Sequence, residues 1–145
     1  MFKLISVAIS ILLFSLTTFA EKINIKANSF ESEQDKIVYS GNVYLHTDKG
    51  REIYCDRLVI FLNKEGKVQK IMAVGKVLYK DKKYTATGKV MIFYPSENKV
   101  VLSGNAVVKS KRGVLQGEKI VYNTKTGRVD VESSVSSVFV IDNSN

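Results

Sequence analysis

The side chains that could support catalysis or metal binding are few and widely separated. His46 is the only histidine, and Cys55, the only cysteine, follows nine residues later. One imidazole and one thiol do not supply the four ligands of a structural zinc site or a nucleophile with an oriented base. Acidic residues such as Asp56 and Glu118 lie mainly at strand starts and turns, and no glycine-rich loop could hold a phosphate. The sequence therefore predicts a protein that is not an enzyme, with no catalytic residue, metal or cofactor.

Two short basic runs offer a different chemistry, which is the binding of anions. Both runs fall in expected turns between strands, at matching places in the chain, and Lys80 begins the first of them. A row of such turns could hold phosphate groups. The alternative is a solvated turn that limits aggregation. The candidate anion-binding residues are Lys82, Lys83, Lys109, Lys111 and Arg112.

The elements that must position these turns have the pattern of β-strands. Val, Ile, Tyr, Phe and Thr dominate between short polar clusters, and Pro95 is the only proline. No segment keeps apolar residues at helical spacing for more than two turns. This pattern predicts an all-β domain of many strands joined by hairpins.

A short sequence recurs around three glycines. YSGNVYL, AVGKVLY and LSGNAVV share Gly41, Gly75 and Gly104. Apolar residues occupy the same alternate positions in every copy, which predicts a strand of about nine residues with one buried face. A glycine in mid-strand marks a bend or the close approach of another backbone. We therefore expect the same bend in each copy.

A second strand follows each copy, and its sequences are YCDRLVIFL, TATGKVMIFY and VLQGEKIVY. The third separates its faces best, with Ile120 and Tyr122 on the apolar side. Matching the strands by register places Phe93 on the same side, together with Val59 and Phe61. The first two strands are apolar on both faces, however, which leaves their inward direction open.

Each pair of strands forms a repeat unit of about 30 residues, like the units of stacked repeat proteins. Residues 23–30 read as a half unit before the first copy, and residues 128–141 as a degenerate unit after the last. A bent hairpin with one apolar face is not stable alone, so the units must stack into two facing sheets. This arrangement is a jelly-roll or a short β-solenoid.

The first twenty residues have the features of a secretory signal peptide. Lys3 precedes an apolar run, and Thr18 and Ala20 occupy the positions that a signal peptidase reads. We expect cleavage after Ala20, which leaves residues 21–145 as one domain; the alternative is a retained membrane anchor near the short limit of a spanning helix. An exported protein with a single cysteine has no internal disulfide, which fits a bacterial periplasm better than a disulfide-rich extracellular setting. There, the formal net charge of +8 favours lipid phosphates, sugar acids or acidic proteins over nucleic acid as partners.

These features together resemble the OstA-like domain of the LptA family of periplasmic lipopolysaccharide transport proteins. That family places Gly-Asn-Val or Gly-Asn-Ala in one strand and Gly-Asp or Ala-Asp at the start of the next. Residues 41–43 and 104–106 match the first element fully, whereas Lys76 replaces its Asn. Cys-Asp and Gly-Glu match the second element loosely. The likeness covers residues 22–141.

The resemblance implies a bent two-sheet β-jellyroll, open along one side, that shields lipopolysaccharide acyl chains in an apolar groove between inner and outer membrane. It also implies head-to-tail self-association, contacts with the related domains of LptC and LptD, and lipid A phosphates held by the basic turns. Each groove residue could equally be an ordinary core side chain. The residues expected to line the groove are Ile23, Ile25, Val43, Leu45, Val77, Phe93, Ala106, Val108 and Tyr122.

Two other interpretations share the same repeats. A chain that keeps its N-terminal segment as an anchor would be an LptC-like receiver of lipopolysaccharide at the inner membrane. A structural β-solenoid would have a closed, dry interior and would bind no amphiphile.

Overall fold

The computed structural model describes residues 22–140 of the chain. The predicted signal peptide, residues 1–20, lies outside these residues. No helix within 22–140 has the length and apolar character that crossing a membrane requires.

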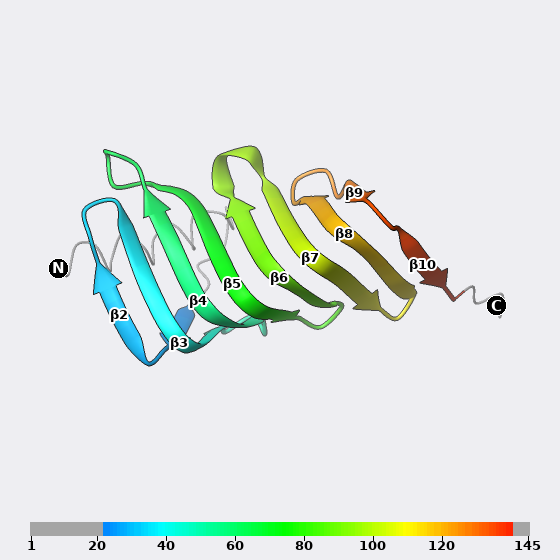
Figure 1. Ribbon diagram of the computed structural model, residues 1–145, viewed down its shortest axis with the longest axis horizontal. Coiled ribbons are helices and arrows are strands. Elements are labelled where there is room, and N and C mark those ends of the chain that lie inside the picture. Colours follow the sequence, from blue (N-terminus) through cyan, green and yellow to red (C-terminus); the bar gives the residue numbers. More distant parts are fainter. Residues whose placement is uncertain (1–21, 141–145) are drawn as a thin grey trace.

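The described residues form one antiparallel sheet, in which each of the six long strands pairs with the long strand that precedes or follows it in the sequence (Figure 1). Two short strands at each end pair with halves of one long strand, β1 and β2 with β3, and β9 and β10 with β8. The strands are β1 (Ile23–Lys26), β2 (Ser29–Ser32), β3 (Lys36–Thr47), β4 (Glu52–Leu62), β5 (Val68–Lys80), β6 (Thr85–Tyr94), β7 (Lys99–Ser110), β8 (Gly113–Asn123), β9 (Val129–Glu132) and β10 (Ser136–Phe139), with a 3-10 turn at Pro95–Glu97.

Every pairing between two long strands is interrupted near its middle by a β-bulge, whose extra residue lies in β3, β5 or β7. In β3, Gly41 and Asn42 have φ angles of 81° and 47° and together face a single residue of β4. Gly75–Lys76 in β5 and Gly104–Asn105 in β7 repeat this pair of left-handed residues. Glycine adopts such angles without the cost of about 1–2 kcal/mol that a β-carbon adds. The predicted bend at each repeated glycine is confirmed.

The bends align across the sheet and divide it into two limbs. The first limb contains β2, β9 and the halves of the long strands that pair with them; the second contains β1, β10 and the other halves. Ser133 and Ser134, between β9 and β10, also have positive φ angles, 63° and 52°. The terminal strand pairs are therefore the two halves of bent strands, as the half unit and the degenerate unit predicted.

The two facing sheets are thus the limbs of a single folded sheet, and the all-β fold is confirmed. All strand pairing runs between the neighbours given above. Within the described part of the chain the limbs are therefore joined only along the bend, and the fold is open along the opposite side.

Apolar side chains of the two limbs meet on the concave side of the fold, called here the inner face. The larger buried cluster combines Ile37, Leu58 and Ile60 of the first limb with Val43 and Val77 of the second. The smaller cluster, nearer the C-terminus, contains Ala86, Leu102, Ala106 and Ile120. The core is therefore substantial in the N-terminal half and thin in the C-terminal half.

The register match that placed Val59 and Phe61 on the apolar side is wrong for their strand, now β4, whose inward direction the sequence left open. Leu58 and Ile60 face the core, and Val59 and Phe61 point to the convex, outer face. The error arises because this strand is apolar on both sides. Val59 belongs to an apolar row that crosses the outer face of the first limb through Val38, Val59, Met72, Ile92, Val101 and Val121.

Candidate functional site

The inner face is built from cross-strand rows of apolar side chains. Directly opposed residues of antiparallel strands point to the same face, so the register defines each row. One row of the first limb runs through Ile37, Ile60, Ile71, Phe93, Val100 and Tyr122. One row of the second limb runs through Ile25, Leu45, Ile53, Tyr79, Ala86, Val108 and Leu115. Together these rows form a trough between the limbs, called the trough below.

The structure brings the nine predicted groove residues onto this inner face. Val43, Leu45, Val77 and Ala106 are buried at 5 % exposure or less. Ile23, Ile25, Phe93 and Val108 are partly buried and pack against the two clusters. Tyr122 shares the face by register but is 42 % exposed and joins neither cluster, because the adjoining Val129 is itself exposed. Their contact with a lipid stays a prediction.

Sequence reasoning missed several residues of the trough. The sequence pattern did not indicate that Leu58 and Ile60 face inward, because their strand is apolar on both faces. For Tyr39 the pattern did indicate it, since this residue occupies an apolar position of the first copy. The structure packs Tyr39 against the larger cluster. Phe30 of β2 lies opposite Tyr39, with ring centroids 5.2 Å apart.

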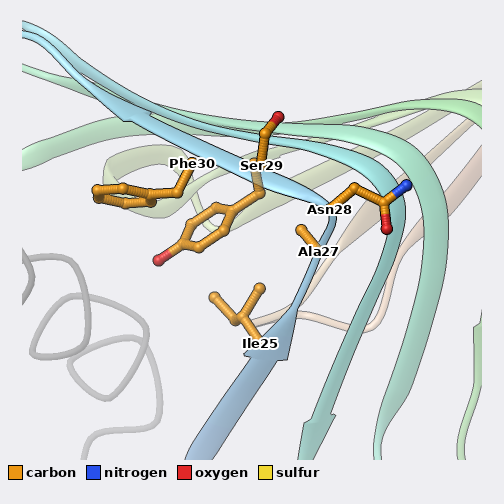
Figure 2. A pocket seen from close by; sticks show the side chains of 6 residues that line it. Ile25, Ala27, Asn28, Ser29 and Phe30 are labelled. Carbon is orange, nitrogen blue, oxygen red and sulfur yellow. The ribbon is translucent and has the colours of Figure 1, made fainter.

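A pocket of about 340 Å³ opens at the N-terminal end of the trough, where the chain bends between β1 and β2. Figure 2 shows Ile25 and Phe30 on the concave side of this bend, whereas Asn28 and Ser29 point away from it. The volume falls within the range of about 300–1,000 Å³ that is usual for small-molecule sites. The pocket is lined by Ile25, Ala27, Asn28, Ser29, Phe30 and Tyr39.

The basic turns lie at the free edge of the second limb, called here the rim. Lys82 and Lys83 are exposed in the β5–β6 turn, and Lys111 and Arg112 are exposed in the β7–β8 turn. Lys109 differs from the prediction, because β7 continues through it and its register partner Thr85 places it on the outer face. Four of the five predicted basic residues therefore occupy adjacent turns of one rim.

Sequence reasoning missed a third basic turn at this rim. Lys49 and Arg51 lie between β3 and β4. A β-carbon added at Gly50, between them, would lie 3.9 Å from Cε of Lys82. The β3–β4 and β5–β6 turns are thus neighbours in space, which extends the basic rim toward the N-terminal pocket.

The inner face offers little reactive chemistry. Burial is the main cause that raises the pKa of the Cys55 thiol to about 11, so the thiol stays protonated near neutral pH. A protonated, buried thiol is a poor nucleophile and a poor metal ligand. Residues 22–140 contain no group of three His, Cys, Asp or Glu side chains that could hold a metal ion.

A comparison with known families identifies the architecture. Residues 24–128 match the family described as LptA/(LptD N-terminal domain) LPS transport protein. The chain belongs to this LptA family. Its relative LptH of Pseudomonas aeruginosa, a lipopolysaccharide export system protein, is 27 % identical over 126 residues, which cover 81 % of this chain and 71 % of LptH.

The LptA-family fold is also found among solved structures. The crystal structure of LptH, the LptA homologous periplasmic component of the lipopolysaccharide transport device of Pseudomonas aeruginosa, matches this chain with a TM-score of 0.71. The match covers 83 % of this chain and 96 % of the LptH chain at 23 % sequence identity. This likeness establishes the fold, the bent β-jellyroll that the sequence predicted.

Proposed function

We propose that this chain is a periplasmic bridge protein that carries lipopolysaccharide toward the outer membrane and shields its acyl chains between the two limbs. The observation that carries the proposal is the trough, whose apolar rows continue across β3 to β8 and open opposite the bend. Each methylene removed from water is worth about 0.8 kcal/mol. A continuous apolar surface would therefore remove most of the barrier to moving a lipid with several chains through water. Membership of a lipopolysaccharide transport family supports the same function.

The degree of burial indicates where acyl chains would make contact first. Phe93 and Val108 are partly exposed and Tyr122 is exposed, so they are accessible from the open side. Val77 and Ala106 are sealed inside the clusters, at 1 % and 0 % exposure. A lipid that reached them would have to part the limbs, which the open side permits because no strand pairing crosses it.

The rim would hold the lipid A head group while the chains lie in the trough. Lysine and arginine are the side chains that bind phosphate oxygens most effectively. Weak contacts repeated along the row of turns would suit a cargo that must keep moving. No single rim residue is therefore expected to be essential.

The two ends of the sheet would join copies of the chain head to tail. β1 and β2 form one edge and β9 and β10 the other, and unpaired edges accept further strands through backbone hydrogen bonds. When unlike ends associate and the chain of copies does not close into a ring, the product is a filament. The same edges would receive the related domains of LptC-like and LptD-like partners.

This function requires export and no chemistry. The chain would reach the periplasm through cleavage of the predicted signal peptide after Ala20. Lipid movement along a shielded surface forms and breaks no covalent bond, so the chain would act as a carrier and not as an enzyme. The energy for directional transport would come from other components.

Two valines of β7 provide a matched test. Val108 faces the trough, whereas its neighbour Val107 lies on the outer face, opposite Thr87 and Gln116. We expect Val108→Asp to weaken lipopolysaccharide binding at least tenfold, because the trough would then hold a charge beside acyl chains. Val107→Asp should leave the affinity unchanged. Binding by thermophoresis, with melting curves of both variants, would measure this, and equal affinities for the two folded variants would contradict the proposal.

A further inference from the structure

The outer face of the first limb is apolar along its centre, although it does not face the core. The apolar row on this face begins with Val38 and Val59, which are 5 % and 4 % exposed. Met72, Ile92 and Val101 continue the row and are partly exposed. An antiparallel sheet with one face on the core commonly turns polar residues to solvent on the other face. A continuous apolar row there indicates a surface with a partner.

Basic side chains border this apolar row on both sides. The strand register places Lys36, Lys70 and Lys99 on the same outer face, along the side nearer the turns. Arg57 and Lys119 lie along the side nearer the bend, opposite serines of β3 and β7. The outer face of the first limb therefore has an apolar centre between two basic borders.

Acidic side chains are confined to the margins of this face. Of the acidic residues in β3 to β8, Asp56 and Glu118 lie at the bend and Glu52 lies in the second limb, whereas those of β2 and β9 lie at the two ends of the face. In the adjoining turns, Glu33 and Glu97 each pair with a bordering lysine, at 3.8 Å and 3.4 Å. Exposed pairs of this kind contribute little to stability, so the lysines can exchange a carboxylate for another anion. The face thus complements an anionic partner.

Two of the bordering lysines lie over aromatic rings. Lys70 Nζ is 4.7 Å from the centroid of the Phe61 ring, and Lys99 Nζ is 5.1 Å from that of Tyr94. At a membrane surface, aromatic rings and the stems of lysines occupy the level of the head groups, and apolar side chains reach the acyl boundary. Binding of this kind combines apolar burial with attraction to anionic lipids. The arrangement of apolar, aromatic and basic side chains on this face matches that partner.

We propose that the outer face of the first limb docks on the surface of a membrane that contains anionic phospholipids. The apolar row would contact the acyl boundary, and the basic borders would contact lipid phosphates. This inference goes beyond the carrier function, because the docking face lies on the opposite side of the sheet from the trough and would leave the trough free for cargo. A second copy of the chain fits this face less well, since back-to-back contact would bring the same basic borders together.

A single introduced tryptophan can report on this contact, because the chain contains none. Ile92→Trp would report on the docking face, and Thr87→Trp, on the outer face of the second limb in the same strand, is the matched control. Residues 21–145 would be mixed with vesicles of phosphatidylglycerol and phosphatidylethanolamine that contain no lipopolysaccharide. The emission of Ile92→Trp should shift to the blue and be quenched by brominated lipid, whereas Thr87→Trp should show neither change. Vesicles of phosphatidylcholine alone should give a much weaker shift.

A pair of double variants tests the basic border. Lys70→Gln with Lys99→Gln should weaken binding to the anionic vesicles about tenfold, since each basic residue near an anionic surface contributes to the attraction. Lys80→Gln with Lys109→Gln removes the same charge from the outer face of the second limb and should leave the affinity unchanged. Vesicle sedimentation would measure both, with melting curves to show that the variants are folded.

Three outcomes would overturn the inference. The first is failure of the wild-type chain to bind anionic vesicles, and the second is an equal loss of binding in the two double variants. The third is a blue shift of Ile92→Trp that follows protein concentration and needs no lipid, which would assign the face to a second copy of the chain. None of them would affect lipopolysaccharide binding in the trough.

Discussion

At the scale of single residues, Asp81 shows how a basic turn of the rim is held in shape. Its carboxylate accepts hydrogen bonds from the Tyr79 hydroxyl and from the backbone N–H groups of Lys83 and Tyr84, each at 2.7 Å. Partial burial alone would raise the pKa of Asp81, but these hydrogen bonds and the nearby charge of Arg51 lower it below its ordinary value. The ionised carboxylate therefore stabilises the turn.

The lowered pKa predicts how stability depends on pH. Because the folded-state pKa lies below the unfolded value of about 3.9, the contribution of Asp81 is complete above that pH. It is lost as the pH falls through the folded-state pKa. Asp81→Asn should therefore be less stable than wild type at pH 7, and the difference should shrink below about pH 4. Urea unfolding between pH 2.5 and 7 would measure it, and a difference that does not change with pH would contradict the assignment.

Single-residue predictions from the sequence succeeded where a strand has one polar face. In β7 the alternation is clear, and Ala106 and Val108 lie on the inner face as expected. In β4 the alternation is absent, and the parity of Val59 and Phe61 was wrong. Which face of a doubly apolar strand turns inward depends on its neighbours' register, which a single strand does not encode.

At the scale of elements, the bend is the device that turns a flat sheet into a trough. Its glycines meet two requirements, a positive φ angle and a close approach of the neighbouring strand. A β-carbon on Gly75 would lie 2.9 Å from Cβ of Asp56, and one on Gly104 would lie 2.6 Å from Cβ of Lys89. Any other residue would have to displace the adjacent strand at the bend.

Two glycines allow the two requirements to be measured separately. Gly66, in the β4–β5 turn, has a φ of 81°, close to the 86° of Gly75, but nothing lies within 4 Å of its added β-carbon. Gly66→Ala should cost about 1–2 kcal/mol of unfolding free energy from backbone strain. Gly75→Ala should cost a further ~1–3 kcal/mol from overpacking. Urea denaturation of both variants would test this, and equal losses would contradict the role assigned to the bend.

The sequence predicted the bends, because glycine in mid-strand is a strong local signal. It could not predict that Ser133 and Ser134 adopt the same left-handed pair, since serine gives no such signal. The N-terminal pocket was also beyond sequence reasoning. It depends on β1 and β2 both pairing with β3, which is a property of the folded sheet.

At the scale of the whole molecule, the core weakens toward the C-terminal end of the trough. Val138 and Phe139 of β10 are 62 % and 72 % exposed. An exposed apolar edge strand is an unusual feature for a solitary protein. It is the expected feature of a surface that joins another copy of the sheet.

The pairing of β10 suggests a variant that blocks such a joint. Val140 N–H donates to the Arg112 carbonyl, so by strand alternation the N–H of Ser137 points away from β8. Ser137→Pro should therefore remove an outward donor without removing a bond within the sheet. We expect wild-type chains to form concentration-dependent oligomers in analytical ultracentrifugation and Ser137→Pro chains to stay monomeric. Unchanged oligomers in the variant would contradict assembly through this edge.

Photo-crosslinking tests the central claim, that acyl chains lie between the limbs, most directly. A photoreactive residue would replace Ile25 or Val108 on the inner face, and the matched controls would be their neighbours Lys26 and Val107 on the outer face. After incubation with lipopolysaccharide, covalent adducts should form at Ile25 and Val108 and be weak or absent at Lys26 and Val107. Adducts on the outer face alone, or none on the inner face of a folded and monodisperse sample, would contradict the account.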